Sequence, residues 1–488
     1  MNHRIILKLL STIVLTVALA FLISLGLGWA IFDEPESVLS AWGICAGFAL
    51  LVASVLGAIG WNADTTFFRK EALATIGLGW LLASLIGALP YLFILGAPFP
   101  DAFFESTSGL TTTGSSVFAE IESFPRSLLF FRCMSQWIGG LGVVVFFVAI
   151  LAFLGAGGKI LYSNEASAQA ADLNTARVQD GVTKIVQLYL VLSLACVIIY
   201  KLCGLGWFDA VCHMFTSVST GGFGTRAESL GAFDNSCLEW WAMLFMILCG
   251  TSFPLLLQLV RGNWRVVLRN AETRVYLALM IAVSVIIAII LYATGGGPGG
   301  GDTIRASCFQ VVSIMTTTGY ATEDYTIWAP ATRIFLLMIM IIGGCAGSTS
   351  GGIKVGRLVA AWKICVLDIE CAFRSHVVRT LRLNGRTLHD DDRAEIMTFI
   401  VMIGFVALAG MALVAVIEPQ LSVPGLVSSV LASLLNIGPG LAEVGPAETF
   451  SFFGGTTKLL LSLLMIMGRL ELYAILALLS PLMWRRFE

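Results

Sequence analysis

The chain has 488 residues, of which 57% are hydrophobic and only 12% are charged, with a formal net charge of −2 and a mean hydropathy of +0.89. Soluble globular proteins carry about 25% charged residues, so the composition argues against a water-soluble enzyme, and the small net charge argues against nucleic acid as a partner. The cysteines lie mostly in apolar stretches (Cys45, Cys133, Cys196, Cys249, Cys365). We interpret them as core thiols rather than disulfides or zinc ligands.

Apolar windows long enough to cross a membrane recur along the chain. A helix needs about 20 such residues to cross about 30 Å of hydrocarbon. The windows begin near residues 9, 40, 72, 127, 182, 239, 275, 329, 394 and 456. The first is longer than the apolar region of a signal peptide and lacks a small-residue cleavage site. The sequence therefore predicts an all-α polytopic membrane protein in which each window is a span.

Charge alternates between successive connections. Basic residues cluster at 4–8, 69–70, 159–184, 261–274, 374–393 and 485–486, and acidic residues at 34–36, 101, 120–122, 228–234, 323–324 and 443. Because Lys and Arg favour the cytoplasmic side, we expect both termini to be cytoplasmic.

Four connections on the acidic side contain an apolar segment too short to span, at residues 100–118, 208–226, 303–322 and 424–445. Each apolar segment is about ten to twelve residues long, the size of a re-entrant helix. Aspartates open two of them, and we interpret Asp101 and Asp209 as helix N-caps rather than ion ligands.

The four segments align on one glycine each: Gly114, Gly222, Gly319 and Gly438. Two positions earlier stand Thr112, Thr220, Thr317 and Asn436, and six positions earlier stand Ser108, Thr216, Ser313 and Ala432. Their spacing indicates an internal repeat of span, short helix, glycine-bearing loop and span, too long for the common solenoids. We divide the chain into two N-terminal helices (1–68) and four pore repeats (69–158, 159–268, 269–388 and 389–488).

Irregular backbone at membrane depth is tolerated only where protein or water satisfies it. Four loops entering from one face can meet around a shared axis, and their carbonyl oxygens can then replace the water shell of a cation. Glycine permits positive φ and adds no Cβ to the lumen. The competing interpretation, polar extracellular turns after amphipathic helices, explains one such loop but not four in register.

The span beginning near residue 329 is interrupted by GGCAGSTSGGIKVGR at 343–357. Each glycine inside a helix costs about 1 kcal/mol relative to alanine, so we predict a flexible intramembrane loop that acts as a gate. Close helix packing through small residues is the alternative. The expected gate residues are Gly343, Gly344, Gly347, Ser348, Thr349, Ser350, Gly351, Gly352 and Lys354. Lys354 is either a second cationic gate element or the first residue to reach cytoplasmic water.

Arg469 lies within the apolar run 459–482. An ionisable group at such a depth is a functional candidate, and Glu471 is two residues away, on a different helix face. We expect Arg469 to project toward the pore and to hold the gate loop through backbone carbonyls. Snorkelling or an ion pair with another helix is the alternative.

These features resemble the superfamily of potassium transporters that includes Trk-type, Ktr-type and plant HKT proteins. The chain is most similar to the bacterial Trk membrane subunits. Three features carry this resemblance: the two extra N-terminal spans, the sequence NIGPG at 436–440, and the sequence MGRLELY at 467–473. The resemblance implies one pseudo-fourfold K⁺ pore per chain. The implied filter residues are Thr112, Thr113, Gly114, Thr220, Gly221, Gly222, Thr317, Thr318, Gly319, Asn436, Ile437 and Gly438. Glycine rather than serine at 114 favours K⁺ over Na⁺ by the same resemblance. The chain lacks the TVGYG sequence of tetrameric K⁺ channels, so we expect looser selectivity.

The resemblance further implies a homodimer in the bacterial cytoplasmic membrane and a cytosolic TrkA-like nucleotide-binding ring as partner. The arginine-rich segments 261–274 and 374–393 can contact anionic lipid or an acidic partner. This chain has no phosphate loop and no dinucleotide fingerprint, so we expect no nucleotide site on it.

Two other functional classes are alternatives to a channel. An alternating-access symporter coupling K⁺ or Na⁺ to H⁺ would usually show inverted repeats and midplane acids, whereas here the repeats all run the same way and the spans hold almost no acid. An intramembrane enzyme would need a catalytic set at membrane depth, and three of the four histidines (His3, His376, His389) lie outside the apolar core.

Overall fold

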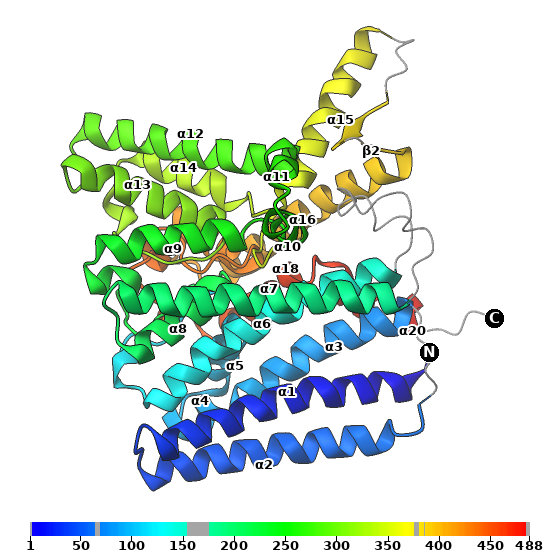
Figure 1. Ribbon diagram of the computed structural model, residues 1–488, viewed down its shortest axis with the longest axis vertical. Coiled ribbons are helices and arrows are strands. Elements are labelled where there is room, and N and C mark those ends of the chain that lie inside the picture. Colours follow the sequence, from blue (N-terminus) through cyan, green and yellow to red (C-terminus); the bar gives the residue numbers. More distant parts are fainter. Residues whose placement is uncertain (1, 64–68, 154–174, 375–379, 385, 485–488) are drawn as a thin grey trace.

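The computed structural model describes residues 2–63, 69–153, 175–374, 380–384 and 386–484. The repeat boundary expected between residues 158 and 159 lies outside these ranges, as do Lys159, Arg379, Arg485 and Arg486. Two long helices come first, α1 (His3–Ala30) and α2 (Glu36–Ile59), packed side by side at one edge of the bundle (Figure 1). The start of α1 and the short helix α20 (Pro481–Trp484) lie at the same end of the molecule (Figure 1).

Four groups of helices come next along the chain, and in each the second or third helix leads into one of the four loops that carry an aligned glycine. The first group is α3 (Arg69–Gly87), α4 (Leu89–Leu95), α5 (Phe99–Leu110) and α6 (Arg126–Phe153). The second is α7 (Thr175–Leu202), α8 (Trp207–Val218), α9 (Ser236–Cys249), α10 (Phe253–Val260) and α11 (Trp264–Arg269). The third is α12 (Ala271–Thr294), α13 (Gly300–Met315), α14 (Pro330–Met340) and α15 (Val355–Phe373). The fourth is α16 (Asp390–Ile417), α17 (Val423–Leu434), α18 (Gly455–Arg469), α19 (Tyr473–Leu479) and α20.

The four short helices are α5, α8, α13 and α17. α5, α8 and α17 have 12 residues each, whereas α13 has 16 and so exceeds the predicted length. Proline in the first turn, at Pro100 and Pro424, helps start α5 and α17 because its missing N–H is not needed there. A short 3₁₀ turn follows each of the four aligned glycines along the chain. These turns are Ile121–Ser123, Ser229–Phe233, Tyr325–Ile327 and Ala442–Val444, with a further turn at Phe450–Phe452.

The spans differ from the prediction in continuity. Among the described residues, seven helices are long and apolar enough to cross a membrane, and nine if two bent pairs are counted. α9 and α10 meet at 106°, and α18 and α19 at 119°, so the continuous spans expected from near 239 and 456 are wrong. Pro254 cannot donate to the helix turn before it, and Glu471 and Leu472 adopt positive φ of 53° and 66°, which ends α18.

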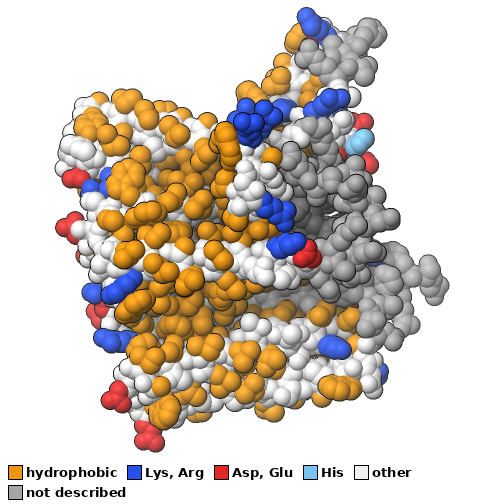
Figure 2. All heavy atoms as spheres, viewed as in Figure 1, with side chains coloured by type: hydrophobic (Ala, Val, Ile, Leu, Met, Phe, Trp, Pro, Cys, Tyr) orange, Lys and Arg blue, Asp and Glu red, His pale blue; other side chains and the backbone are white. Residues whose placement is uncertain are grey.

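The outer surface of the bundle is apolar over its middle, with charged side chains gathered toward its ends (Figure 2). Large side chains such as Leu51, Leu194 and Phe405 face outward there, as expected where lipid replaces water. A small antiparallel hairpin, β1 (Arg382–Leu383) and β2 (Arg386–Thr387), comes after α15, which projects from the bundle (Figure 1). The confirmed fold class is an all-α multi-pass membrane protein.

Candidate functional site

The four short helices end in the same hydrogen-bonded turn. In each, the residue before the aligned glycine donates its backbone N–H to the carbonyl five residues earlier. The pairs are Thr113 to Ser108, Gly221 to Thr216, Thr318 to Ser313 and Ile437 to Ala432, at 2.9, 2.8, 2.9 and 2.9 Å. Because one backbone turn recurs at all four places, we name residues 112–114, 220–222, 317–319 and 436–438 the glycine loops.

The sign of φ alternates along each glycine loop. Thr112, Thr220, Thr317 and Asn436 have φ of 52°, 52°, 54° and 55°, and the four aligned glycines have φ of 89°, 81°, 80° and 104°. The residue between them has negative φ in every loop. Such alternation gathers successive N–H groups on one side of the chain, so carbonyl oxygens are left for the other side. Threonine and asparagine in the left-handed region are unusual, and four occurrences at one position indicate a required backbone shape.

The glycine loops form a closed ring. A Cβ built on Gly114 would meet the Gly221 carbonyl oxygen, and one on Gly222 would meet that of Thr318. One on Gly319 would meet the Ile437 oxygen, and one on Gly438 would lie 2.7 Å from the Thr113 oxygen. All four separations are below 3.0 Å, where real Cβ atoms essentially never lie. Each loop therefore touches the next, the fourth touches the first, and only glycine fits at the contacts.

Side chains tie neighbouring loops together. Asn436 Nδ2 donates to Thr113 Oγ1 at 2.9 Å, and Ser115 Oγ donates to the Gly438 carbonyl at 2.8 Å. Within the first and third loops, hydroxyl pairs join Thr111 to Thr113 at 2.7 Å and Thr316 to Thr318 at 2.8 Å. The ring is therefore held by specific hydrogen bonds in addition to packing.

One supporting position was missed by the sequence reasoning. Nine residues before the aligned glycines stand Glu105, His213, Gln310 and Ser429, all buried. A Glu105 carboxylate oxygen accepts from Val117 N at 3.0 Å. With the Gln310 amide oxygen turned toward Thr322, that oxygen accepts from Thr322 N at 3.1 Å. His213 Nε2 lies 3.4 Å from Thr225 Oγ1. In the first three groups, the side chain at this position therefore binds the segment that follows the glycine loop. The signal in the sequence was a polar residue at the same offset from all four glycines.

Arg132 and Gln136 of α6 support the second glycine loop. Arg132 Nε pairs with Glu105 Oε1 at 2.7 Å, with both side chains almost fully buried, and its Nη1 donates to the Gly224 carbonyl at 3.1 Å. Gln136 Nε2 donates to the Gly221 carbonyl at 2.6 Å. A buried pair needs such additional hydrogen bonds to offset the loss of hydration.

The interrupted span is non-helical between α14 and α15. Ile342 and Ile353 form an isolated parallel bridge, and Gly343 N donates to the Ile353 carbonyl at 2.9 Å, so the two ends of the break lie together. From Gly343 to Gly351 every residue is buried. We name residues 341–354 the broken segment. Its contacts are specific and extensive, so in this arrangement it is a folded element.

The broken segment lies directly against the glycine loops. Gly351 N donates to Thr317 Oγ1 at 2.6 Å, and Thr349 Oγ1 lies 3.2 Å from Thr220 Oγ1. A Cβ on Gly351 would meet the Leu435 carbonyl oxygen. The broken segment therefore touches residues of the second, third and fourth groups.

Arg469 is 5% exposed and donates from Nη1 to the Thr349 carbonyl at 2.7 Å. Lys354 Nζ donates to the Ser350 carbonyl within the same segment. Lys354 is buried, which argues against the alternative that it is the first residue to reach water. The alternative of an Arg469 ion pair has no support among the described contacts, because Glu471 instead pairs with Arg357 at 2.6 Å.

Glu272 of α12 holds the other side of the broken segment. Its Oε1 accepts from Ala346 N at 2.7 Å and from Gly356 N at 2.9 Å, and the side chain is buried. One carboxylate oxygen therefore holds both the middle of the segment and the first turn of α15. Sequence reasoning did not identify Glu272, because its position near the start of a span resembles that of any interfacial acid.

The acidic residues near the other end of the ring have varied partners. Asp101 pairs with Lys458 Nζ at 2.7 Å and Asp209 accepts from Thr225 Oγ1 at 2.6 Å, while α5 and α8 begin without a side-chain cap. The predicted N-cap roles are therefore wrong, because these side chains bind groups from other segments. Burial works to raise the pKa of Glu443, but hydrogen bonds from Ser422 lower that pKa below its ordinary value.

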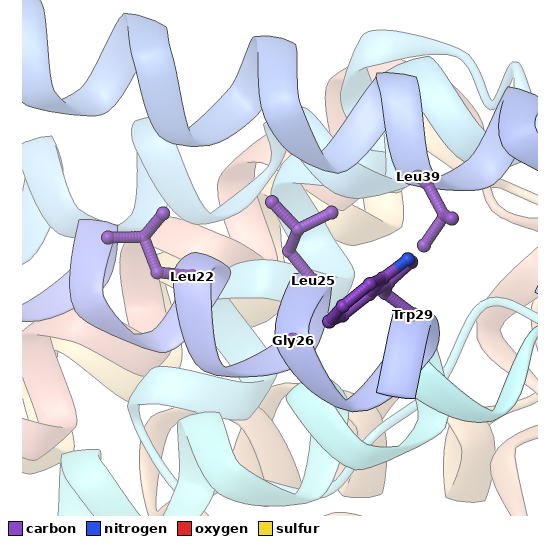
Figure 3. Close-up of a pocket in the computed structure, with 5 residues that line it drawn as sticks. All are labelled: Leu22, Leu25, Gly26, Trp29 and Leu39. Atoms are coloured by element: carbon purple, nitrogen blue, oxygen red, sulfur yellow. The ribbon is translucent and has the colours of Figure 1, made fainter. Parts of the chain in front are cut away.

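A separate apolar pocket lies between α1 and α2. Its lining is Leu22, Leu25, Gly26, Trp29 and Leu39 (Figure 3). It holds no carboxylate, hydroxyl or inward carbonyl cluster, and Trp29 is 73% exposed. Since the glycine loops lie elsewhere, this pocket is a feature of the apolar surface and not part of the ring.

Comparison with known proteins gives a consistent picture. Residues 48–484 match the family described as TrkH, cation transport protein. The chain is 32% identical to the Trk system potassium uptake protein TrkI of Halomonas elongata, over 99% of this chain and 97% of that one. It is 33% identical to the Trk system potassium uptake protein TrkH of Escherichia coli, over 85% and 86% of the two chains.

The fold also matches a solved structure. The crystal structure of the potassium transporter TrkH from Vibrio parahaemolyticus superposes with a TM-score of 0.89 and 26% identity, covering 99% of this chain and 100% of that one. These matches confirm the resemblance noted from the sequence and the expectation of a transport protein rather than an enzyme. The chain belongs to the TrkH family of cation transport proteins.

Proposed function

We propose that this chain is the pore-forming subunit of a Trk-type system that takes up K⁺ across the bacterial cytoplasmic membrane. The observation that carries the proposal is the ring in which each aligned glycine touches the carbonyl of the next loop. The names of the relatives, which are potassium uptake proteins, support K⁺ as the ion. The four groups of helices correspond to the four pore repeats at 69–158, 159–268, 269–388 and 389–488, with 1–68 as an addition.

The glycine loops are the proposed selectivity filter. A dehydrated K⁺ exchanges its water for backbone carbonyl oxygens of residues 112–114, 220–222, 317–319 and 436–438. No side-chain ligand is required, and the hydroxyl and amide groups of Thr113, Thr318 and Asn436 hold the loops in shape. Neighbouring loops touch, so the filter radius is set by backbone contacts rather than by flexible side chains.

The broken segment and Arg469 form the proposed gate. The segment contacts Thr220 and Thr317 of the filter, so ions leaving the filter meet it first. Arg469 adds a buried positive charge at the same level, and a cation approaching it is repelled. Opening requires the segment to move away from the filter, and its glycines make an alternative backbone path accessible.

Orientation and partners are inferred from charge. Both termini are placed in the cytoplasm by the positive-inside rule, with the filter loops opening to the outside. The relatives are named as proteins of a Trk system, which supports a membrane component of a multi-subunit system. From the family resemblance we infer a cytosolic TrkA-like nucleotide-binding ring as its regulator and a homodimer of this chain in the membrane. The basic segments 261–274 and 374–393 are the proposed contacts for that regulator or for anionic lipid.

Ion flux into vesicles tests the function. Purified protein is reconstituted in liposomes loaded with K⁺, and uptake of radioactive rubidium is measured with and without a pH gradient. We expect uptake that K⁺ outside the vesicles inhibits more strongly than Na⁺. Uptake that occurs only with a pH gradient would indicate the coupled symporter instead. Absence of any monovalent cation flux, from protein that remains monodisperse, would refute the proposal.

A further inference from the structure

Two cysteines face each other at the end of the bundle opposite α20. Cys203 directly follows α7, and Cys237 lies in the first turn of α9 (Figure 1). Their Sγ atoms are 3.1 Å apart, although 34 positions separate the residues in the chain. Cys237 is exposed and Cys203 is partly exposed, so a reagent in solution reaches the pair.

The backbone around the pair is fixed by Asn235. The Asn235 side chain accepts from Leu238 N at 3.2 Å, which caps α9, and its Nδ2 donates to the Cys203 carbonyl at 2.7 Å. One residue therefore joins the end of α7 to the start of α9. Because this bond does not involve sulfur, the approach of the two helix ends does not depend on the state of the thiols.

We propose that Cys203 and Cys237 form a disulfide in the mature protein. The pair needs only a small side-chain adjustment to reach bonding distance, since a sulfur–sulfur bond is about 2.05 Å long. The site rests on the proposed orientation, which places this end of the bundle in the periplasm, where disulfides form and persist. The bond links the first span of the second repeat to its second span and encloses the short helix α8.

The reaction is thiol–disulfide exchange with a protein or small-molecule disulfide in that compartment. The Cys237 sulfur, as thiolate, attacks the oxidant's disulfide and releases one oxidant thiolate. The Cys203 sulfur then attacks Cys237 Sγ in the mixed disulfide and releases the second thiolate. The two protons lost by the cysteines are taken up by the two released thiolates, so the oxidant is reduced to two thiols.

Other cysteines are placed differently. Cys133 and Cys212 also face each other, but both are buried and out of reach of an oxidant in solution. Cys371 is exposed, but it lies on α15, toward the other end of the molecule (Figure 1). Cys371 therefore serves as a matched control, because by the same orientation it faces the reducing cytoplasm.

The test is disulfide mapping of the full-length protein from cells. Free thiols are blocked with N-ethylmaleimide in intact cells, and the purified protein is digested with trypsin without reductant. We expect the peptides 202–226 and 227–261 to be joined, two hydrogen atoms lighter than their sum, with fragmentation assigning the link to Cys203 and Cys237. Cys203→Ser and Cys237→Ser each remove the link, whereas Cys371→Ser leaves it in place.

Alkylated Cys203 and Cys237 in protein from cells would overturn the proposal. Incubating purified, unalkylated protein with oxidised glutathione then identifies the failed step. Linkage under that condition would mean that the compartment, and hence the orientation, is wrong, and continued absence of linkage would mean that the geometry is wrong. Rubidium uptake by the same preparation is measured separately, so failure of the disulfide is distinguishable from failure of K⁺ transport.

Discussion

Replacing Arg469 with glutamine tests whether its contact keeps the broken segment against the filter. Arg469 Nη1 donates to the Thr349 carbonyl at 2.7 Å, and glutamine is too short to reach the same oxygen from the same backbone position. Hydrogen bonds to charged groups contribute about 1.5–3 kcal/mol. If this bond is made only when the segment blocks the filter, its loss shifts the closed-to-open equilibrium by about 10- to 150-fold.

The expected result is a large rise in the initial rate of rubidium uptake into vesicles, measured per reconstituted protein. Arg393→Gln is the control, because Arg393 pairs with Asp390 at 3.2 Å, away from the broken segment, and makes the same change in net charge. Arg469→Lys separates the two contributions. Lysine keeps the charge but presents a point charge instead of the guanidinium fork, so a rise in Arg469→Lys as well assigns the effect to the hydrogen bond.

Unchanged or lower uptake in Arg469→Gln, from protein that is monodisperse and elutes like the unmodified chain, would refute this reasoning. It would mean that the contact with Thr349 is equally present in the conducting arrangement. The buried guanidinium would then be a structural element of the bundle.

Three further substitutions test the filter and the segment around it. Gly319→Ala forces a Cβ against the Ile437 carbonyl at a backbone φ of 80°, where a residue other than glycine costs about 1–2 kcal/mol. Competition assays are therefore expected to show a reduced preference for K⁺ over Na⁺. The control Gly404→Ala, in open space on α16, retains that preference. Glu105→Gln leaves Arg132 buried without its counter-charge, which lowers the free energy of unfolding by about 3–5 kcal/mol. The midpoint of thermal unfolding is expected to fall well below that of Arg305→Gln, which breaks a partly exposed ion pair. Equal midpoints for the two variants would contradict this expectation. Glu272→Ala removes the acceptor for two backbone N–H groups, and leaving each of them buried and unpaired costs about 1–3 kcal/mol. We expect faster proteolysis within residues 341–354 together with higher rubidium uptake.

The sequence was informative wherever a local pattern repeats. All ten predicted windows coincide with a helix, and the four aligned glycines lie at the contacts of one ring. Both signals survive because they depend on short-range rules, namely the length of an apolar run and the freedom of glycine. Composition windows do not record backbone direction, so they missed the bends after Cys249 and Arg469, although Gly250 and Pro254 marked the first of these.

Long-range partners were less accessible from the sequence. Glu105 and Arg132 are 27 residues apart, and their pairing depends on how α5 packs against α6. Glu272 reaches a segment 74 residues away, and the choice of Arg357 as the partner of Glu471 requires knowing that α15 begins beside the end of α18. The residue types alone identify charged side chains within apolar stretches of the sequence. Which of these side chains form ion pairs depends on how the helices pack.

The second spans of the first, second and fourth groups each contain or precede a closely packed glycine, and the sequences of the four second spans diverge beyond that level. Cβ atoms on Gly139 and Gly468 would overlap the carbonyl oxygens of Leu110 and Leu434, the last residues of α5 and α17, whereas one on Gly250, directly after α9, would first meet the Tyr276 hydroxyl. Close approach to the ends of α5 and α17 thus demands glycine at positions 139 and 468. α6 then continues through an apolar run, α9 stops before a proline, α14 opens into the broken segment, and α18 ends at Arg469. Glycine preserves equivalent contacts in the first and fourth groups, while the unequal sequences after the glycines place the long non-helical break between α14 and α15 in the third group. One chain that contributes all four glycine loops can therefore keep the proposed filter nearly symmetric and still carry the proposed gate in one repeat, an arrangement that four identical subunits cannot adopt without breaking their symmetry.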